Sequence, residues 1–128
     1  MAEIPQDLKY TRDHEWVQPL SPTTVRVGVT AHAAEHLGDV VFVSLPAVGA
    51  RLGAGDACAE LESTKSVSDV YAPLAGVISA VNDAVAEAPE AINAEPYGDG
   101  WLFEMELSAA AAADELLDAA KYQSLLDD

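Results

Sequence analysis

The sequence predicts a mainly β domain, and three observations support this fold class. Short runs of alternating apolar and polar residues recur along the chain, for example TVRVGVT at residues 24–30. Turn-forming stretches such as SPT at residues 21–23 separate these runs. At 128 residues, of which 50% are hydrophobic, the chain is long enough for one core but not for two. We therefore expect a single domain over residues 1–128.

The predicted strands follow one another along a β core that covers about residues 8–107. The pattern places them at residues 15–18, 24–30, 39–45, 56–62, 66–71, 76–82 and 101–107. Residues 31–37 are rich in Ala and lack β-branched side chains, so a short helix or a turn is expected there, with Gly38 as its stop. A helical segment should follow at about residues 108–126. Its predicted cap is Ser108, and its predicted apolar contacts are Leu116, Leu117, Leu125 and Leu126.

A weak internal repeat links two of the predicted strands. Residues 40–49 and 67–76 both read V-x-x-V-x-x-P-x-x-G. So short a match can arise by chance, but it also fits a fold made of two similar halves. Lys65 lies between the two copies, where a connecting hairpin would be.

Composition disfavours several classes of function. Six Lys and Arg residues stand against 22 Asp and Glu residues, a formal charge of -16 that repels phosphate backbones, so no nucleic-acid partner is expected. Cys58 is the only cysteine, which excludes an intrachain disulfide and a cysteine metal cluster. The N-terminal residues MAEIPQDLKY resemble neither a secretory signal nor a transit peptide, and no apolar run approaches membrane-spanning length. We expect a cytoplasmic monomer that does not enter a membrane.

The segment ELESTKSVSDVY at residues 60–71 places Lys65 at the tip of the predicted hairpin. The plainest interpretation is an ordinary solvated lysine. A catalytic Schiff-base lysine needs burial or neighbouring cations, whereas Lys65 is flanked by the carboxylates Glu62 and Asp69. A third interpretation is that Lys65 serves as an attachment point.

A resemblance favours the third interpretation. Glu62-Ser63-Thr64-Lys65, with Ser68-Asp69-Val70-Tyr71-Ala72-Pro73 and Gly76, resembles the lipoyl-attachment motif of the glycine cleavage system H-protein family. Further blocks that resemble this family are Tyr10-Thr11, His14-Glu15-Trp16-Val17, Gly28-Val29-Thr30, Leu37-Gly38-Asp39-Val40-Val41-Phe42-Val43, Leu45-Pro46, Pro96-Tyr97-Gly98, Gly100-Trp101-Leu102 and Glu115-Leu116-Leu117. They run in order over nearly the whole chain. Biotin carriers place Met on both sides of the modified lysine, whereas the flanks here are Thr64 and Ser66.

The resemblance implies a fold, a cofactor and a set of partners. The fold would be a barrel-sandwich hybrid of the lipoyl and biotinyl carrier type, in which two antiparallel sheets carry short helices, mainly at the C-terminus. Lipoate would be attached to Lys65 by an amide bond, with Glu62, Ser63 and Asp69 as the context of the lipoylation motif. The protein would be a carrier and not an enzyme. Its partners would be a pyridoxal-phosphate glycine decarboxylase, a tetrahydrofolate-dependent aminomethyltransferase, dihydrolipoyl dehydrogenase and the lipoylating enzymes.

The resemblance also implies a cleft that shields the arm when it carries an aminomethyl group. Glu15, His36 and Asp69 match the polar lining of that cleft. A carboxylate near the cationic amine would stabilise it electrostatically. The alternative for each residue is an ordinary solvated side chain and, for His36, packing at a helix end.

Two other functions remain open at this point. Residues 32–36 read HAAEH, which fits the H-x-x-E-H pattern of a family of zinc hydrolases and would place His32 and His36 on one helix face. Separately, an H-like lipoyl relay could serve other lipoate-dependent enzymes.

Overall fold

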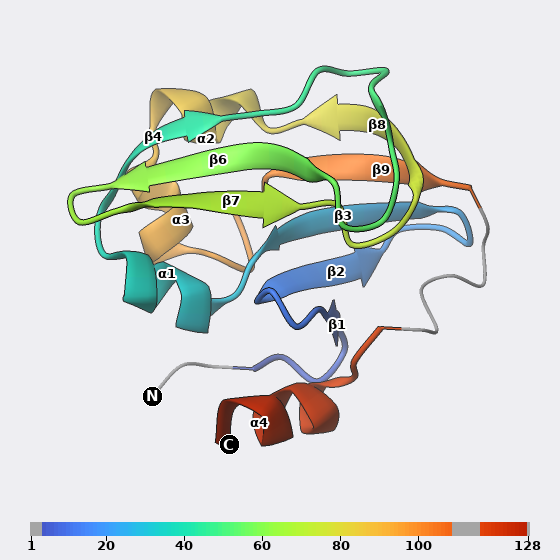
Figure 1. The fold of residues 1–128 in the computed structure, drawn as a ribbon, viewed down its shortest axis with the longest axis horizontal. Helices are drawn as coiled ribbons and strands as arrows, with labels where there is room; N and C mark the ends of the chain where they lie inside the picture. The colour runs from blue at the N-terminus through green and yellow to red at the C-terminus, as the bar shows by residue number, and fades with distance from the viewer. Residues whose placement is uncertain (1–3, 109–115, 128) are drawn as a thin grey trace.

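Two antiparallel sheets enclose the main core of the molecule (Figure 1). The computed structural model describes residues 4–108 and 116–127. The six-stranded sheet contains, in spatial order, β1 (Lys9–Tyr10), β2 (Glu15–Pro19), β3 (Thr24–Val29), β9 (Phe103–Leu107), β8 (Gly76–Val81) and β5 (Arg51–Leu52). The three-stranded sheet contains β4 (Val40–Ser44), β6 (Ala57–Ser63) and β7 (Val67–Tyr71), with β6 in the centre. The predicted fold class, mainly β with two antiparallel sheets and short helices, is confirmed.

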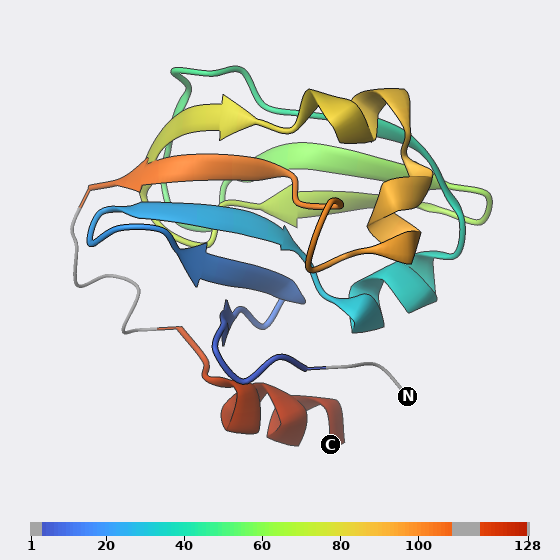
Figure 2. The ribbon, with the colours of Figure 1, turned by 180° about the vertical axis from the view of Figure 1, so that it is seen from behind.

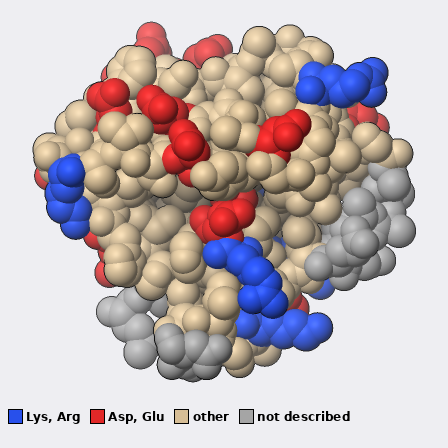
Figure 3. All heavy atoms as spheres, in the orientation of Figure 1, with Lys and Arg blue, Asp and Glu red and all other residues tan. Residues whose placement is uncertain are grey.

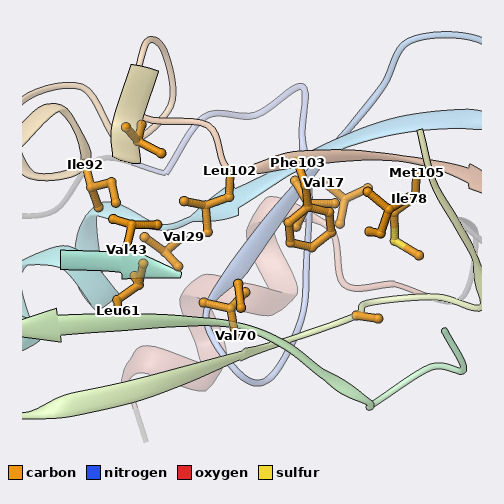
Figure 4. Packing of buried hydrophobic residues seen from close by; sticks show 14 of the residues in the cluster. Val17, Val29, Val43, Leu61, Val70, Ile78, Ile92, Leu102, Phe103 and Met105 are labelled. Atoms are coloured by element: carbon orange, nitrogen blue, oxygen red, sulfur yellow. The ribbon is translucent and has the colours of Figure 1, made fainter. Parts of the chain in front are cut away.

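Apolar side chains from the facing surfaces of the two sheets form this core. Figure 4 shows residues of the six-stranded sheet, such as Val17 and Phe103, opposite Leu61 and Val70 of the three-stranded sheet. All four are at most 2% exposed. The alternating pattern that predicted the strands therefore also identifies the faces that are buried.

The predicted strand positions agree with the observed ones to within two residues at each end. Two strands were not predicted, β1 and β5, because each has only two residues and shows no alternation. The two copies of the internal repeat lie in comparable places. They contain β4 and β7, the edge strands of the three-stranded sheet, and the chain continues from them into β5 and β8, which pair with each other.

Among the described residues, the helices do not lie mainly at the C-terminus, contrary to the prediction. Of the four described helices, α1 (Ala31–Leu37), α2 (Asp83–Glu87) and α3 (Glu90–Ala94) precede the C-terminal segment, and only α4 (Ala119–Asp127) lies within it. Helix α1 matches its predicted bounds, and Gly38 ends it with φ 80°. Helices α2 and α3 have five residues each and one buried residue each, Val85 and Ile92. So few apolar positions give no helical periodicity, which is why the sequence did not predict these two helices. The Asn82 side chain caps α2 by accepting a hydrogen bond from the backbone N–H of Ala84.

The structure describes only the end of the predicted C-terminal helical segment, from residue 116 onward. Helix α4 begins at Ala119, and Leu117 before it forms a β-bridge with Tyr10. Ring stacking of Tyr122 on Tyr10, with centroids 4.7 Å apart, helps α4 to close a second apolar cluster beside β1. Leu117, Leu125 and Leu126 pack against this cluster, whereas Leu116 packs against the main core. The cap predicted at Ser108 concerns residues 109–115, which lie outside the described residues.

Helices α1 and α3 lie at the same end of the molecule as the tip of the β6–β7 hairpin (Figures 1 and 2). Helix α4 lies apart from them, next to β1. This arrangement places the lysine-bearing tip beside α1 and the connection that leads into β4.

Replacement of Gly28 by Ala should destabilise the fold through overpacking. Gly28 is paired with Trp16 across β2 and β3, and a Cβ atom at Gly28 would lie 2.6 Å from the indole ring. We expect Gly28→Ala to lower the free energy of unfolding by about 1–3 kcal/mol in urea titrations. Gly53→Ala is the matched control, because its Cβ would be 3.4 Å from the nearest atom, Oδ2 of Asp56. Equal losses in the two variants would contradict this explanation.

Candidate functional site

The β6–β7 hairpin presents Lys65 as an exposed side chain in a turn built by serine. The Ser63 hydroxyl oxygen accepts hydrogen bonds from the backbone N–H groups of Lys65, at 3.2 Å, and Ser66, at 3.1 Å. The backbone N–H of Ser63 donates to the carbonyl of Ser66 at 2.8 Å. The serine side chain thus stabilises a turn that has neither Asn-Gly nor Asp-Gly.

The same tip is joined to the connection between α1 and β4. The backbone N–H of Thr64 donates to the carbonyl of Asp39 at 3.1 Å. The methylene groups of Lys65 lie over Gly38, where an added Cβ atom would be 3.4 Å from Cε of the lysine. The backbone beneath Lys65 is therefore held from two sides while its side chain stays exposed.

Acidic residues surround the hairpin on the outer face of the three-stranded sheet. Glu62 is exposed and pairs in register with Val67, and Asp69 is exposed and pairs with Glu60. Figure 3 shows acidic side chains in several places on the face that this sheet forms. Because like charges directly opposite on a sheet are unfavourable, the Glu60–Asp69 pair does not serve stability.

A cleft of about 280 Å³ lies beside the hairpin and brings together the three residues predicted to line it. Glu15, at the start of β2, His36, on α1, and Asp69, on β7, all border it. The other lining residues are Asp13, His14, Val29, Ala33, Leu37, Leu61, Ser66, Val67, Ser68 and Val70. The cleft thus combines apolar residues with a few polar groups and opens next to Lys65.

Glu15 is buried in the structure, so the alternative of a solvated side chain is wrong for this residue. It is 1% exposed, and its Oε2 accepts a hydrogen bond of 2.8 Å from the backbone N–H of Tyr71 in β7. Its Oε1 accepts one of 3.0 Å from the hydroxyl of Thr11. Burial raises the pKa of Glu15 from its usual 4.5 to about 7, although the hydrogen bonds from Tyr71 and Thr11 act in the opposite direction. A carboxyl that can bind or release a proton near neutral pH therefore borders the cleft.

His36 is exposed, so packing at a helix end does not describe it. Its ring centroid is 4.4 Å from that of His32, which in turn is 4.7 Å from that of His14. Burial, followed by neighbouring imidazoles, lowers the pKa of His14 and of His32. Nδ1 of His14 is 2.8 Å from the hydroxyl oxygen of Tyr122, so this row of rings links the cleft to α4.

His14 also borders the cleft, although the sequence did not predict it there. The residue has φ 68°, the only positive φ of a described non-glycine residue, which rotates the backbone just before Glu15. The sequence offered one indication, since His14 directly precedes Glu15, which was predicted to line the cleft. Nothing in the run His14-Glu15-Trp16 indicated the backbone conformation of His14. Ser66, Val67 and Ser68 were also missed, because spacing alone does not show which edge of β7 faces the cleft.

A second and larger cleft, of about 690 Å³, lies between α1 and α3. It is lined by Ala31, Ala34, Glu35, Gly38, Asp39, Asn93, Ala94, Glu95, Pro96 and Tyr97. Gly38, over which the Lys65 side chain lies, is therefore also part of the wall of this cleft.

Comparison with known proteins decides the family. The family model described as "Glycine cleavage H-protein" matches residues 8–128. The chain belongs to the glycine cleavage H-protein family. A glycine cleavage system H protein from Nocardia farcinica is 56% identical over 130 residues, which cover 98% of each chain. One from Salmonella arizonae is 51% identical over 128 residues, covering 100% of this chain and 99% of that protein. The crystal structure of an H protein from Mycobacterium marinum superimposes with a TM-score of 0.88 at 45% identity, covering 98% of this chain and 100% of that one.

Membership in the H-protein family replaces the zinc-hydrolase alternative. His32 and His36 do share a face of α1, as the HAAEH pattern predicted. In the described residues, however, no group of three or more His, Cys, Asp or Glu side chains could hold a metal ion.

No described helix combines the length and the apolar character needed to cross a bilayer.

The raised pKa of Glu15 should make the stability of the protein depend on pH. Between pH 4.5 and about 7 the folded protein keeps a proton on Glu15 that the unfolded chain has released. The stabilisation that this proton provides is therefore fully present below pH 4.5 and is lost as the pH rises through 7. From about pH 4.5 to about pH 8, the parent should therefore lose stability relative to Glu15→Gln, by at most roughly 3 kcal/mol. Urea titrations of both proteins across this range measure the difference. A difference that does not change with pH would contradict the prediction.

Proposed function

We propose that Lys65 carries lipoate through an amide bond and that the chain works as the lipoyl carrier of the glycine cleavage system. The observation that carries this proposal is the exposed Lys65 on a turn whose backbone is bound by Ser63 and Asp39. A modifying enzyme needs free access to the amine, and partner enzymes need the attachment point in a constant place. The exposed side chain meets the first requirement and the bound backbone meets the second, and membership in the H-protein family supports the proposal.

The residues around Lys65 fit the proposed cofactor. The side chain is exposed, and the adjacent cleft of about 280 Å³ offers apolar residues, among them Val29, Leu37 and Leu61, for a hydrocarbon arm and its sulfur ring. When bound, lipoate would supply a disulfide that takes up an aminomethyl group and is reduced. The protein itself would position, present and shield the arm, and no catalytic role is proposed for its own residues.

Glu15, His36 and Asp69 are proposed to form the polar part of the cleft that receives the loaded arm. Asp69 is exposed and can place a carboxylate near a cationic amine. The two oxygens of Glu15 are already used by Tyr71 and Thr11, so its contribution would depend on its protonation. A cationic ligand nearby would favour the ionised carboxylate and would lower the pKa of Glu15.

The proposed partners follow from the proposed cargo. Glycine decarboxylase would load the arm, aminomethyltransferase would unload it, and dihydrolipoyl dehydrogenase would reoxidise it, after lipoylating enzymes had attached it. A tethered arm reaches each docked active site at a high effective concentration. The acidic surface would favour basic docking surfaces on these enzymes. The cytoplasmic location and the monomeric state stay predictions.

Intact-mass measurement tests the attachment site. Protein produced with lipoate and a lipoate–protein ligase should gain the mass of one lipoyl group, and Lys65→Arg should gain none. Lys121→Arg is the matched control, since it changes another exposed lysine of the three in the chain and should leave the modification intact. Modification that survives Lys65→Arg would refute the proposed site.

The proposed role of Asp69 predicts a faster loss of cargo when its charge is removed. Water would convert a loaded arm to free thiol, formaldehyde and ammonia, and a carboxylate beside the amine should slow this hydrolysis. We expect Asp69→Asn to raise the rate of formaldehyde release from loaded protein, without aminomethyltransferase, by about fivefold. Glu60→Gln removes the charge paired with Asp69 in the sheet but does not border the cleft, so it should have little effect. Equal rates in the two variants would refute the role.

A further inference from the structure

The Asn93 side chain joins three parts of the chain at the end of the molecule that carries Lys65. Its Oδ1 accepts a hydrogen bond of 2.9 Å from the backbone N–H of Val40, the first residue of β4. Its Nδ2 donates to the carbonyl of Gly38 at 2.9 Å and to the carbonyl of Ala34, in α1, at 3.5 Å. One side chain of α3 thus fixes both ends of the connection between α1 and β4.

That connection contacts the hairpin tip directly. The carbonyl of Asp39 accepts the hydrogen bond from Thr64, and Gly38 lies under the methylene groups of Lys65. Val40 is also paired with Ser63, whose hydroxyl shapes the turn. The residues that Asn93 holds on one side are therefore those that hold the tip on the other.

Helix α3 is also attached to the core through a residue other than Asn93. Ile92 is fully buried in the main core, whereas Asn93 is only half-buried and borders the large cleft between α1 and α3. Water in that cleft can replace the hydrogen bonds of a lost side chain, so truncation should leave the fold intact. What would change is the constraint on Gly38 and Asp39.

We propose that Asn93 is a positioning residue for the lipoyl-bearing tip. Its side chain fixes Gly38 and Val40 on either side of Asp39. The Asp39 carbonyl and the surface of Gly38 then hold Thr64 and Lys65 in the arrangement that partner enzymes bind. Without it, the competent arrangement is populated for a smaller fraction of the time. The Michaelis constant of an enzyme that acts on Lys65 then rises, while the rate of the bound complex is unchanged. This inference rests on the proposed attachment of lipoate to Lys65.

Three variants test the inference, one of them a matched control. Asn93→Ala removes all three hydrogen bonds, and Asn93→Asp keeps an acceptor for Val40 but loses the donor to Gly38. Asn82→Ala is the control, because Asn82 also binds backbone groups, with Nδ2 donating to the carbonyls of Asp99 at 2.9 Å and Trp101 at 2.8 Å, but has none of these contacts to the tip. Thermal unfolding of each variant shows that it is folded at the assay temperature.

The first measurement is residue-resolved hydrogen exchange of the unmodified proteins. In Asn93→Ala the Thr64 amide should exchange about fivefold faster, because the loss of a typical net hydrogen bond permits opening of the tip. The effect should be smaller in Asn93→Asp and absent in Asn82→Ala, and amides in β3 should exchange as in the parent. Unchanged exchange at Thr64, or the same increase in Asn82→Ala, would overturn the inference.

The second measurement is the kinetics of lipoylation by a lipoate–protein ligase with each protein as substrate. We expect KM to rise about fivefold for Asn93→Ala with kcat unchanged, and Asn93→Asp to recover part of the loss. A parent-like KM in Asn93→Ala would refute the positioning role alone. If the parent itself gained no lipoyl group at Lys65, the proposed function would fail instead, and hydrogen exchange would still decide whether Asn93 positions the tip.

Discussion

The buried carboxyl group of Glu15 connects the two sheets, and the geometry of the candidate site depends on it. Glu15 begins β2 in the six-stranded sheet and accepts a hydrogen bond from Tyr71 at the end of β7 in the three-stranded sheet. The core positions β7 through Val70, but apolar packing is not directional, whereas this hydrogen bond fixes the edge of β7 against β2. That edge, together with α1, forms the cleft beside Lys65. Burial at this junction raises the pKa of Glu15, because removing the carboxylate from water disfavours its charged form.

A fixed base with a free arm is the physical requirement of a carrier, and the Lys65 region has both features. The backbone of the tip is bound by Ser63 within the hairpin and by Asp39 of the connection between α1 and β4. The lysine side chain itself is exposed. The positioning role proposed for Asn93 extends this base one layer further, from the tip through the α1–β4 connection to α3. Rigid support beneath a mobile group lets one short chain present the same attachment point to several enzymes.

Much of the fold could be predicted from the sequence, because period-2 patterns identify half-buried strands such as β3 and their buried faces. Helices α2 and α3 could not, since one buried residue each gives no periodicity. The motif positions predicted that Lys65 lies at a hairpin tip. By resemblance to the family they also predicted that one cleft is lined by Glu15, His36 and Asp69. The burial of Glu15 was not predicted, because it results from β2 and β7 meeting in space. The role proposed for Asn93 also arises from contacts between residues 53–59 positions apart, which no local pattern contains.

We propose that the arm on Lys65 moves into the cleft between α1, β2 and β7 when it carries an aminomethyl group. Solution NMR of the lipoylated protein before and after loading by glycine decarboxylase tests it most directly. Loading should change the amide shifts of Leu37, Ser68 and Val70 and should lower the pKa of the Glu15 carboxyl below its value of about 7. Shift changes confined to Thr64–Ser66, with an unchanged titration of Glu15, would contradict it.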